Sequence, residues 1–202
     1  MKGMGILVMG SALIMVVFVI IMPFVQIFFQ PVRGEITNIE LRTEAYTMGN
    51  ALAAAGVYMG SALRFSAYQA MHDTGMQGGW DAIPAGKSFQ AGEGSYAIWH
   101  NGSDVSPSED ELKASLGKSV AAWLGKYREK GFRFLNDYSV RLPVYSPVLV
   151  SEFTGSSFSV SAMPDSRMSI QKGSQDGSTN VLLERTASLQ DSFSYPYLEL
   201  FR

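Results

Sequence analysis

The sequence predicts an α+β protein: an N-terminal transmembrane helix running into a long helix, then a second amphipathic helix and a C-terminal antiparallel β-sheet. Three observations predict this class. No residue from Gly3 to Val32 is charged, the stretch 35–74 contains no proline, and the chain after Asn136 alternates apolar residues with serine. The predicted units are a membrane segment, 1–32, and an extracytoplasmic α+β domain, 33–202.

The apolar run is long enough to cross a bilayer. At about 1.5 Å per residue, a helix over this run exceeds the roughly 30 Å hydrocarbon core. A cleavable signal peptide has an apolar region of only about 7 to 15 residues before a small-residue cleavage site. No Gly, Ala or Ser lies between Ala12 and Gly34. A retained membrane segment is therefore favoured over a signal peptide, and also over a buried helix of a soluble protein, which is normally shorter and striped.

The flanking charges and the size of the C-terminal part favour a single pass with the N-terminus inside and the domain outside the cell. Lys2 lies on one side of the run, with Arg33 and Arg42 on the other, partly offset by acidic residues. Asn101 begins an Asn-Gly-Ser sequence, the acceptor pattern for N-glycosylation, which fits an outside location. We therefore expect a cell-membrane protein with lipid as its first partner.

Proline and glycine residues lie within the predicted span and at its outer end. Pro23 lies inside it, where a missing backbone hydrogen bond predicts a bend or a locally loosened helix. Pro31 and Gly34 follow at its outer end and predict a hinge before the long helix 35–74.

The middle of that long helix is rich in small residues. Gly56 and Gly60 are four positions apart, which places them on one helical face and lets another helix approach closely. One interpretation is tight packing of this face against the chain's own domain, which we favour; the other is self-association.

A break and a second helix follow. The glycine-rich segment 76–106 predicts loops with one short strand at 96–99. Ser106, Pro107 and Glu109 then predict an N-cap, a first helical residue and a capping-box glutamate for a helix over 107–131.

The remainder, 138–202, predicts four to six short antiparallel strands that pack one face against the helices. Alternation at 158–162 and 168–170 predicts two strands, and Pro164-Asp165-Ser166 predicts a hairpin turn between them. Further strands are expected at 181–189 and 197–201.

No arrangement of residues predicts catalysis, so we expect no enzyme, no cofactor and no metal site. Cysteine is absent, and the two histidines, His72 and His100, have no supporting motif. Ser115 and Lys118 match an S-x-x-K spacing, but inside an amphipathic helix and without companion motifs. The net charge of −2 without a basic stripe excludes a typical nucleic-acid partner, and no small-molecule substrate is indicated.

The N-terminus resembles that of type IV pilins and pilin-like proteins, the archaeal members above all. Lys2-Gly3 directly precedes an uninterrupted apolar helix with Pro23 in its outer half and a helix-plus-β domain behind it. The resemblance implies peptidase cleavage after Gly3, Met4 as the first mature residue, and bundling of the apolar helices as the core of a filament. Val8 stands at the fifth mature position, where bacterial pilins carry glutamate.

Three functions remain open. The first is a subunit of a cell-surface filament or pseudopilus of prokaryotic, archaeal type, which self-associates through its N-terminal helix. Burial of apolar helix surface at roughly 25 cal/mol per Å² would drive that bundling. The second is a permanently anchored single-span ectodomain that binds another envelope protein or a ligand. A weaker third is an anchored hydrolase whose serine and histidine meet only in the fold.

Overall fold

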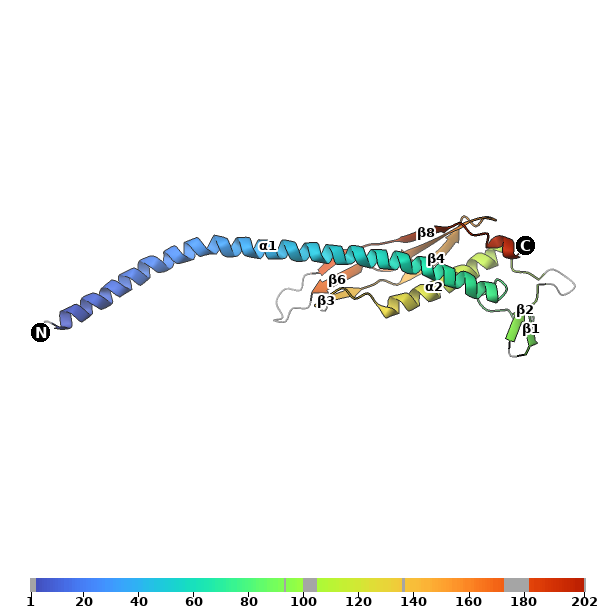
Figure 1. Cartoon of the computed structure of the whole chain (residues 1–202), viewed down its shortest axis with the longest axis horizontal. Coiled ribbons are helices and arrows are strands. Elements are labelled where there is room, and N and C mark those ends of the chain that lie inside the picture. The colour runs from blue at the N-terminus through green and yellow to red at the C-terminus, as the bar shows by residue number, and fades with distance from the viewer. Residues whose placement is uncertain (1–2, 93, 100–104, 136, 173–181, 202) are drawn as a thin grey trace. The chain divides into compact units, whose positions relative to one another are not determined.

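The computed structural model of this chain describes residues 3–92, 94–99, 105–135, 137–172 and 182–201, with side chains described from Ile39 onward except that of Leu200. Its helices are α1 (Gly3–Met76), α2 (Glu109–Lys130) and a short 3₁₀ helix, η1 (Leu198–Phe201) (Figure 1). The chain divides into two compact units, residues 1–47 and 48–202. All the described strands, and α2, belong to the second unit.

The described strands form three small antiparallel sheets. A hairpin joins β1 (Ser88–Ala91) and β2 (Gly94–Ala97). A second sheet has the order β3-β6-β7, with β3 (Tyr138–Arg141), β6 (Met168–Lys172) and β7 (Leu182–Arg185). The third has the order β4-β5-β8, with β4 (Tyr145–Ser151), β5 (Phe158–Pro164) and β8 (Leu189–Phe193). The predicted α+β class, with helices and antiparallel strands, is confirmed.

Helix α1 continues through the predicted hinge. Its helical backbone includes both Pro31 and Gly34, so the long helix expected at 35–74 is the C-terminal part of a longer one. The predicted bend at Pro23 and the domain boundary after residue 32 fall where side chains are not described, and both stay predictions. Within the described side chains, no helical stretch is both long and apolar enough for a bilayer crossing; the run 3–32 lies outside them.

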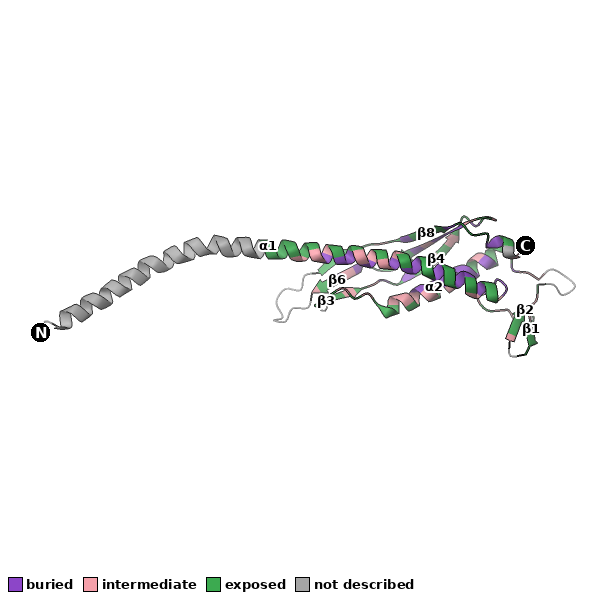
Figure 2. Cartoon of the chain, in the orientation of Figure 1, coloured by how far each residue is buried: buried purple, intermediate pink, exposed green. Residues whose placement is uncertain are grey.

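From Met48 onward one face of α1 forms the core of the second unit. Buried residues recur at three- and four-residue spacing, as a helix with one packed face requires (Figure 2). They are Met48, Ala51, Leu52, Ala55, Met59, Ala62, Leu63, Ala67, Ala70 and Met71. The same core contains the buried face of α2 and the inward side chains of β5, β6 and β8.

Helix α2 begins two residues later than predicted. Its N-cap is Ser108, whose Oγ accepts a hydrogen bond from the Glu111 backbone N–H at 3.3 Å, while Glu111 Oε2 accepts one from the Ser108 N–H at 2.8 Å. The cap predicted at Ser106 with Glu109 is therefore wrong. The helix does form the predicted kind of capping box, a serine with a glutamate three residues later. The later start places all three acidic residues in the first turn, where the helix dipole favours them.

Ser108→Ala is expected to lower the free energy of unfolding by about 1 kcal/mol, since it leaves first-turn N–H groups uncapped. The Ser108 hydrogen bonds lower the pKa of Glu111. The stabilisation is therefore present above the unfolded-state pKa of Glu111 and is lost as pH falls through the lowered folded-state pKa. Urea unfolding of the full chain at neutral and acidic pH measures both effects. Ser119→Ala, inside the same helix, is the matched control and should not destabilise.

Two strand predictions are wrong. The segments 158–162 and 168–170 are not a hairpin, because β5 pairs with β4 and β8 while β6 pairs with β3 and β7. Asp165, from the predicted turn, instead joins the segment before β4: its N–H donates to the Val144 carbonyl, and its Oδ1 accepts from the Val144 N–H. The strand expected at 197–201 is instead the 3₁₀ helix η1.

Strand β5 is the centre of its sheet and of the core. Phe158, Val160 and Ala162 are buried, as the predicted alternation requires. Phe158 stacks on Phe193 of β8 with ring centroids 5.0 Å apart. Strand β4, on the opposite edge of this sheet from β8, lies close to α2. A Cβ on Gly117 of α2 would lie 3.1 Å from the Val148 carbonyl oxygen of β4. A glycine in α2 thus permits the helix to lie on the sheet.

Candidate functional site

The N-terminal residues implied by the pilin resemblance are not described in side-chain detail. Lys2 and Asn101 lie outside the described residues, and Gly3, Met4 and Pro23 are described only as helical backbone. Their predicted roles in processing, glycosylation and helix packing stay predictions. The residues that the structure does place are the two glycines of α1.

Gly56 and Gly60 do not pack closely against the chain's own domain. A Cβ built on either one meets no described atom within 4 Å. Glycine in a helix interior costs about 1 kcal/mol relative to alanine, so the chain carries a cost here that its own described packing does not offset. The favoured interpretation, tight packing within the domain, is not what the structure shows at these positions.

The glycines lie beside two hollows that meet at Val57, and we call this surface the α1 groove. One hollow, about 460 Å³, lies between Gly60, Ser61 and Phe65 of α1 and Gln190 and Asp191 of β8. The other, about 500 Å³, lies between Ala53 and Gly56 of α1 and the segment 185–189. Both belong to the second unit.

Large apolar side chains stand exposed along the same stretch of helix. Val57 is 71% exposed, Phe65 56% and Tyr68 51%. Tyr68 also packs edge-on against Phe193 of β8, with ring centroids 5.6 Å apart. Exposed apolar side chains beside open glycines offer both projections and recesses to a partner, which is the pattern of an interaction surface.

An ion pair holds the wall of the α1 groove in place. Arg64 Nε donates to Asp191 Oδ2 at 2.8 Å, and Nη2 donates to Oδ1 at 3.3 Å, which makes the contact bidentate. The hydrogen bond and the charge of Asp191 raise the pKa of Arg64, and the bond to Arg64 lowers the pKa of Asp191. Both groups are charged at neutral pH, so α1 and β8 are tied together across the hollow.

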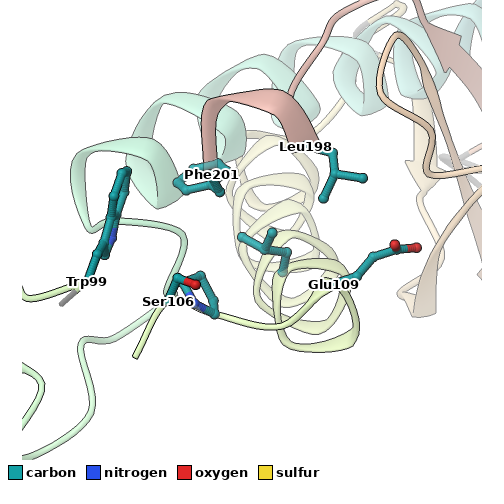
Figure 3. Close-up of a pocket in the computed structure, with 7 residues that line it drawn as sticks. Trp99, Ser106, Glu109, Leu198 and Phe201 are labelled. Atoms are coloured by element: carbon teal, nitrogen blue, oxygen red, sulfur yellow. The ribbon is translucent and has the colours of Figure 1, made fainter. Parts of the chain in front are cut away.

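A second surface feature is a hollow of about 410 Å³ at the start of α2, lined by both polar and apolar residues (Figure 3). Trp99 and Phe201 meet there with ring centroids 5.7 Å apart, and buried Leu112 and Leu198 also line it. The Trp99 indole N–H is already engaged by the Gly78 carbonyl at 3.2 Å. Ser106, Pro107 and Glu109 line it as well, so the hollow offers both apolar contact and polar groups to an occupant.

The residues that resembled catalytic motifs do not form a catalytic site among the described residues. His72 is exposed and lies beside Asp73, whose Oδ2 accepts from the Trp123 indole at 2.7 Å. Ser115 is buried in α2, and Lys118 pairs with Asp81. His100 lies outside the described residues, as does any pairing it makes. Within the described part of the chain, no three His, Asp or Glu side chains gather as metal ligands.

The sequence indicated one wall of the α1 groove but missed the other. The glycine spacing pointed to a helical face, whereas the segment 185–191 carried no signal beyond a strand pattern. It reaches α1 through the pairing of β8 with β5, a contact between segments far apart in the chain.

Comparison with known proteins gives no match: no family model, curated protein or solved structure resembles this chain to a significant degree.

Proposed function

We propose that this chain is a membrane-anchored structural protein with an extracytoplasmic domain, similar to a type IV pilin, that assembles with its own copies into a surface filament or pseudopilus. The observation that carries the proposal is the continuity of α1. One helix begins at Gly3 in the uncharged run and continues to Met76 in the core of the folded unit. In this proposal, the helical backbone continues from the anchoring run into the sequence of the domain.

The α1 groove supports self-association as part of this function. It leaves Gly56 and Gly60 open beside exposed Val57 on the same helix. Closely packed helices recur where small residues let two backbones approach, and exposed apolar area adds a hydrophobic contribution outside lipid.

The mature N-terminus tests the processing step. Intact-mass measurement of protein from membranes or sheared filaments is expected to show Met4 as the first residue. Lys2→Ala with Gly3→Leu should then keep the unprocessed N-terminus and reduce material that pellets as filaments. A retained Met1 in protein that still pellets as filaments would contradict cleavage after Gly3.

A permanently anchored ectodomain is the second candidate, and the hollow beside Trp99 favours it. Its mixed lining, which includes the Trp99 and Phe201 rings and Glu109, fits a side chain of another envelope protein. Crosslinking from position 99 in intact cells separates the two functions, since capture of another envelope protein without filaments supports the anchored module.

A further inference from the structure

The part of α1 just before the core of the second unit carries large apolar side chains that its own chain leaves uncovered (Figure 2). Ile39 is 63% exposed and Tyr46 is 73% exposed. They are seven residues apart, so an α-helix places them on one face, about 10 Å apart along its axis. Leu41 is also exposed, but two residues turn a helix by about 200°, which places it on the opposite face. The segment 39–46 therefore has one apolar face with two projecting side chains.

The α1 groove has two hollows in line, which match these two side chains in spacing and in chemistry. From Ala53 to Phe65, the α1 residues that line the hollows span about 18 Å of helix. The lining of the hollow nearer Ala53 includes the apolar residues Ala187 and Leu189, which suit an isoleucine. The lining of the hollow nearer Phe65 includes Gln190, whose amide suits the hydroxyl of a tyrosine.

The segment and the groove also have opposite net charges. The charged residues of the segment carry a formal charge of −1, from two glutamates and one arginine: Glu40, Arg42 and Glu44. The charged residues that line the groove carry +1, from two arginines and one aspartate: Arg64, Arg185 and Asp191. Arg185 is exposed and makes no ion pair with another described residue. Electrostatic attraction thus favours the segment over a second copy of the groove as the occupant.

We propose that the segment 39–46 of a neighbouring copy lies in the α1 groove, with Ile39 at the Ala53 end. This contact rests on the proposed function, in which all copies point the same way out of one membrane and their helices lie parallel. Ile39 then lies beside a stretch of its neighbour about 16 residues further along α1, a shift of about 24 Å. A shifted contact joins two different surfaces and cannot close on itself, so it repeats from copy to copy as an open filament.

Crosslinking between single-cysteine variants tests the contact, because the chain has no cysteine of its own. Thr43→Cys and Ser61→Cys are introduced into separate full-length chains that carry different tags, and the chains are coexpressed and treated in membranes with a short bismaleimide. Thr43 lies on the same helical face as Ile39 and Tyr46, Ser61 lines the groove, and both are exposed. The yield of mixed dimer is expected to exceed that of Leu41→Cys with Ser61→Cys about tenfold, since bound residues have a high effective concentration.

Three outcomes would overturn the proposal. One is crosslinking of Ser61→Cys with itself as efficiently as in the mixed pair, because two grooves would then face each other. Another is absence of the mixed dimer while urea unfolding shows that both variants are folded. The third is a crosslink from Ser61→Cys to a different protein alone.

Pelleting of sheared filaments from the same cells decides the proposed function separately. Filaments whose copies crosslink groove to groove would leave the pilin-like function standing and contradict only this contact. Loss of filaments from cells that express the wild-type chain would contradict the function itself.

Substitutions in the segment give a second measurement that needs no crosslink. Ile39→Ser combined with Tyr46→Ala is expected to weaken self-association of the full chain in detergent about tenfold or more, because two apolar side chains lose their burial between copies. Both residues are exposed, so the free energy of unfolding should not change. Leu41→Ser, on the opposite face, is the matched control and should change self-association less than about twofold. Equal losses in the two variants would indicate non-specific apolar attraction and would contradict the contact.

Discussion

Replacing both Gly56 and Gly60 with leucine is expected to weaken self-association about tenfold or more while leaving the fold as stable as before or more so. Neither position has a described atom within 4 Å of an added Cβ, and both border the open hollows of the α1 groove, where longer side chains extend away from the core. Leucine is also the better helix former, by about 0.8 to 1 kcal/mol per site. The two leucines would nevertheless fill the recess that a second copy is proposed to enter.

Urea unfolding and analytical ultracentrifugation of the full chain in detergent measure the two effects separately. Gly75→Leu is the matched control, because Gly75 lies in the same helix, is equally open, and does not line the α1 groove. A loss of stability of about 2 kcal/mol or more in the double variant would show that these glycines pack inside the domain. Unchanged self-association would remove the α1 groove as a contact between copies.

Replacing Leu13, Val17 and Ile20 together with arginine is expected to abolish membrane retention. On the insertion scale, each arginine near the centre of a span costs about 2.5 to 3.5 kcal/mol, and each lost aliphatic residue removes a further few tenths. The total is about 10 kcal/mol, which is large enough to offset the apolar gain of the remaining run. A single arginine would be a weaker test, because a long run tolerates one charge.

Membrane fractionation after alkaline washing measures the effect. Val17→Leu combined with Ile20→Leu keeps the run apolar and should leave the protein in the membrane fraction. If the arginine variant also stayed there, residues 3–32 would not be the anchoring segment.

Local chemistry made the helices predictable. The acidic residues after a serine and the basic residues before Gly131 define α2 within two residues at its start and one at its end. The choice between Ser106 and Ser108 as the cap was harder, because a glutamate follows each of them three residues later. The wrong choice shifted the start of the helix but not its buried face.

Strand pairing was not predictable, because its determinants lie far apart in the chain. Pro164-Asp165-Ser166 has the composition of a hairpin turn, yet the strands on either side belong to different sheets. The burial of Phe158 against Phe193 decides the partner of β5, and no local signal reports that contact. The strand predicted at 197–201 was wrong for a similar reason. Tyr197 is largely apolar and is buried, but the chain after it forms the 3₁₀ helix η1.

The two walls of the α1 groove also differ in how far local sequence predicts them. Glycine spacing on one helix located the α1 groove, since a helical period can be read directly from sequence. The β8 wall of the groove, by contrast, depends on the pairing of β8 with β5, which no local pattern reports.

The anchoring role of residues 3–32 is tested most directly by density-gradient flotation of the wild-type full chain from expressing cells after an alkaline wash. The protein is expected to float with membrane vesicles, or to sediment as filaments once sheared from the cell surface. Recovery in the soluble load fraction would contradict the membrane anchor and, with it, the proposed pilin-like function.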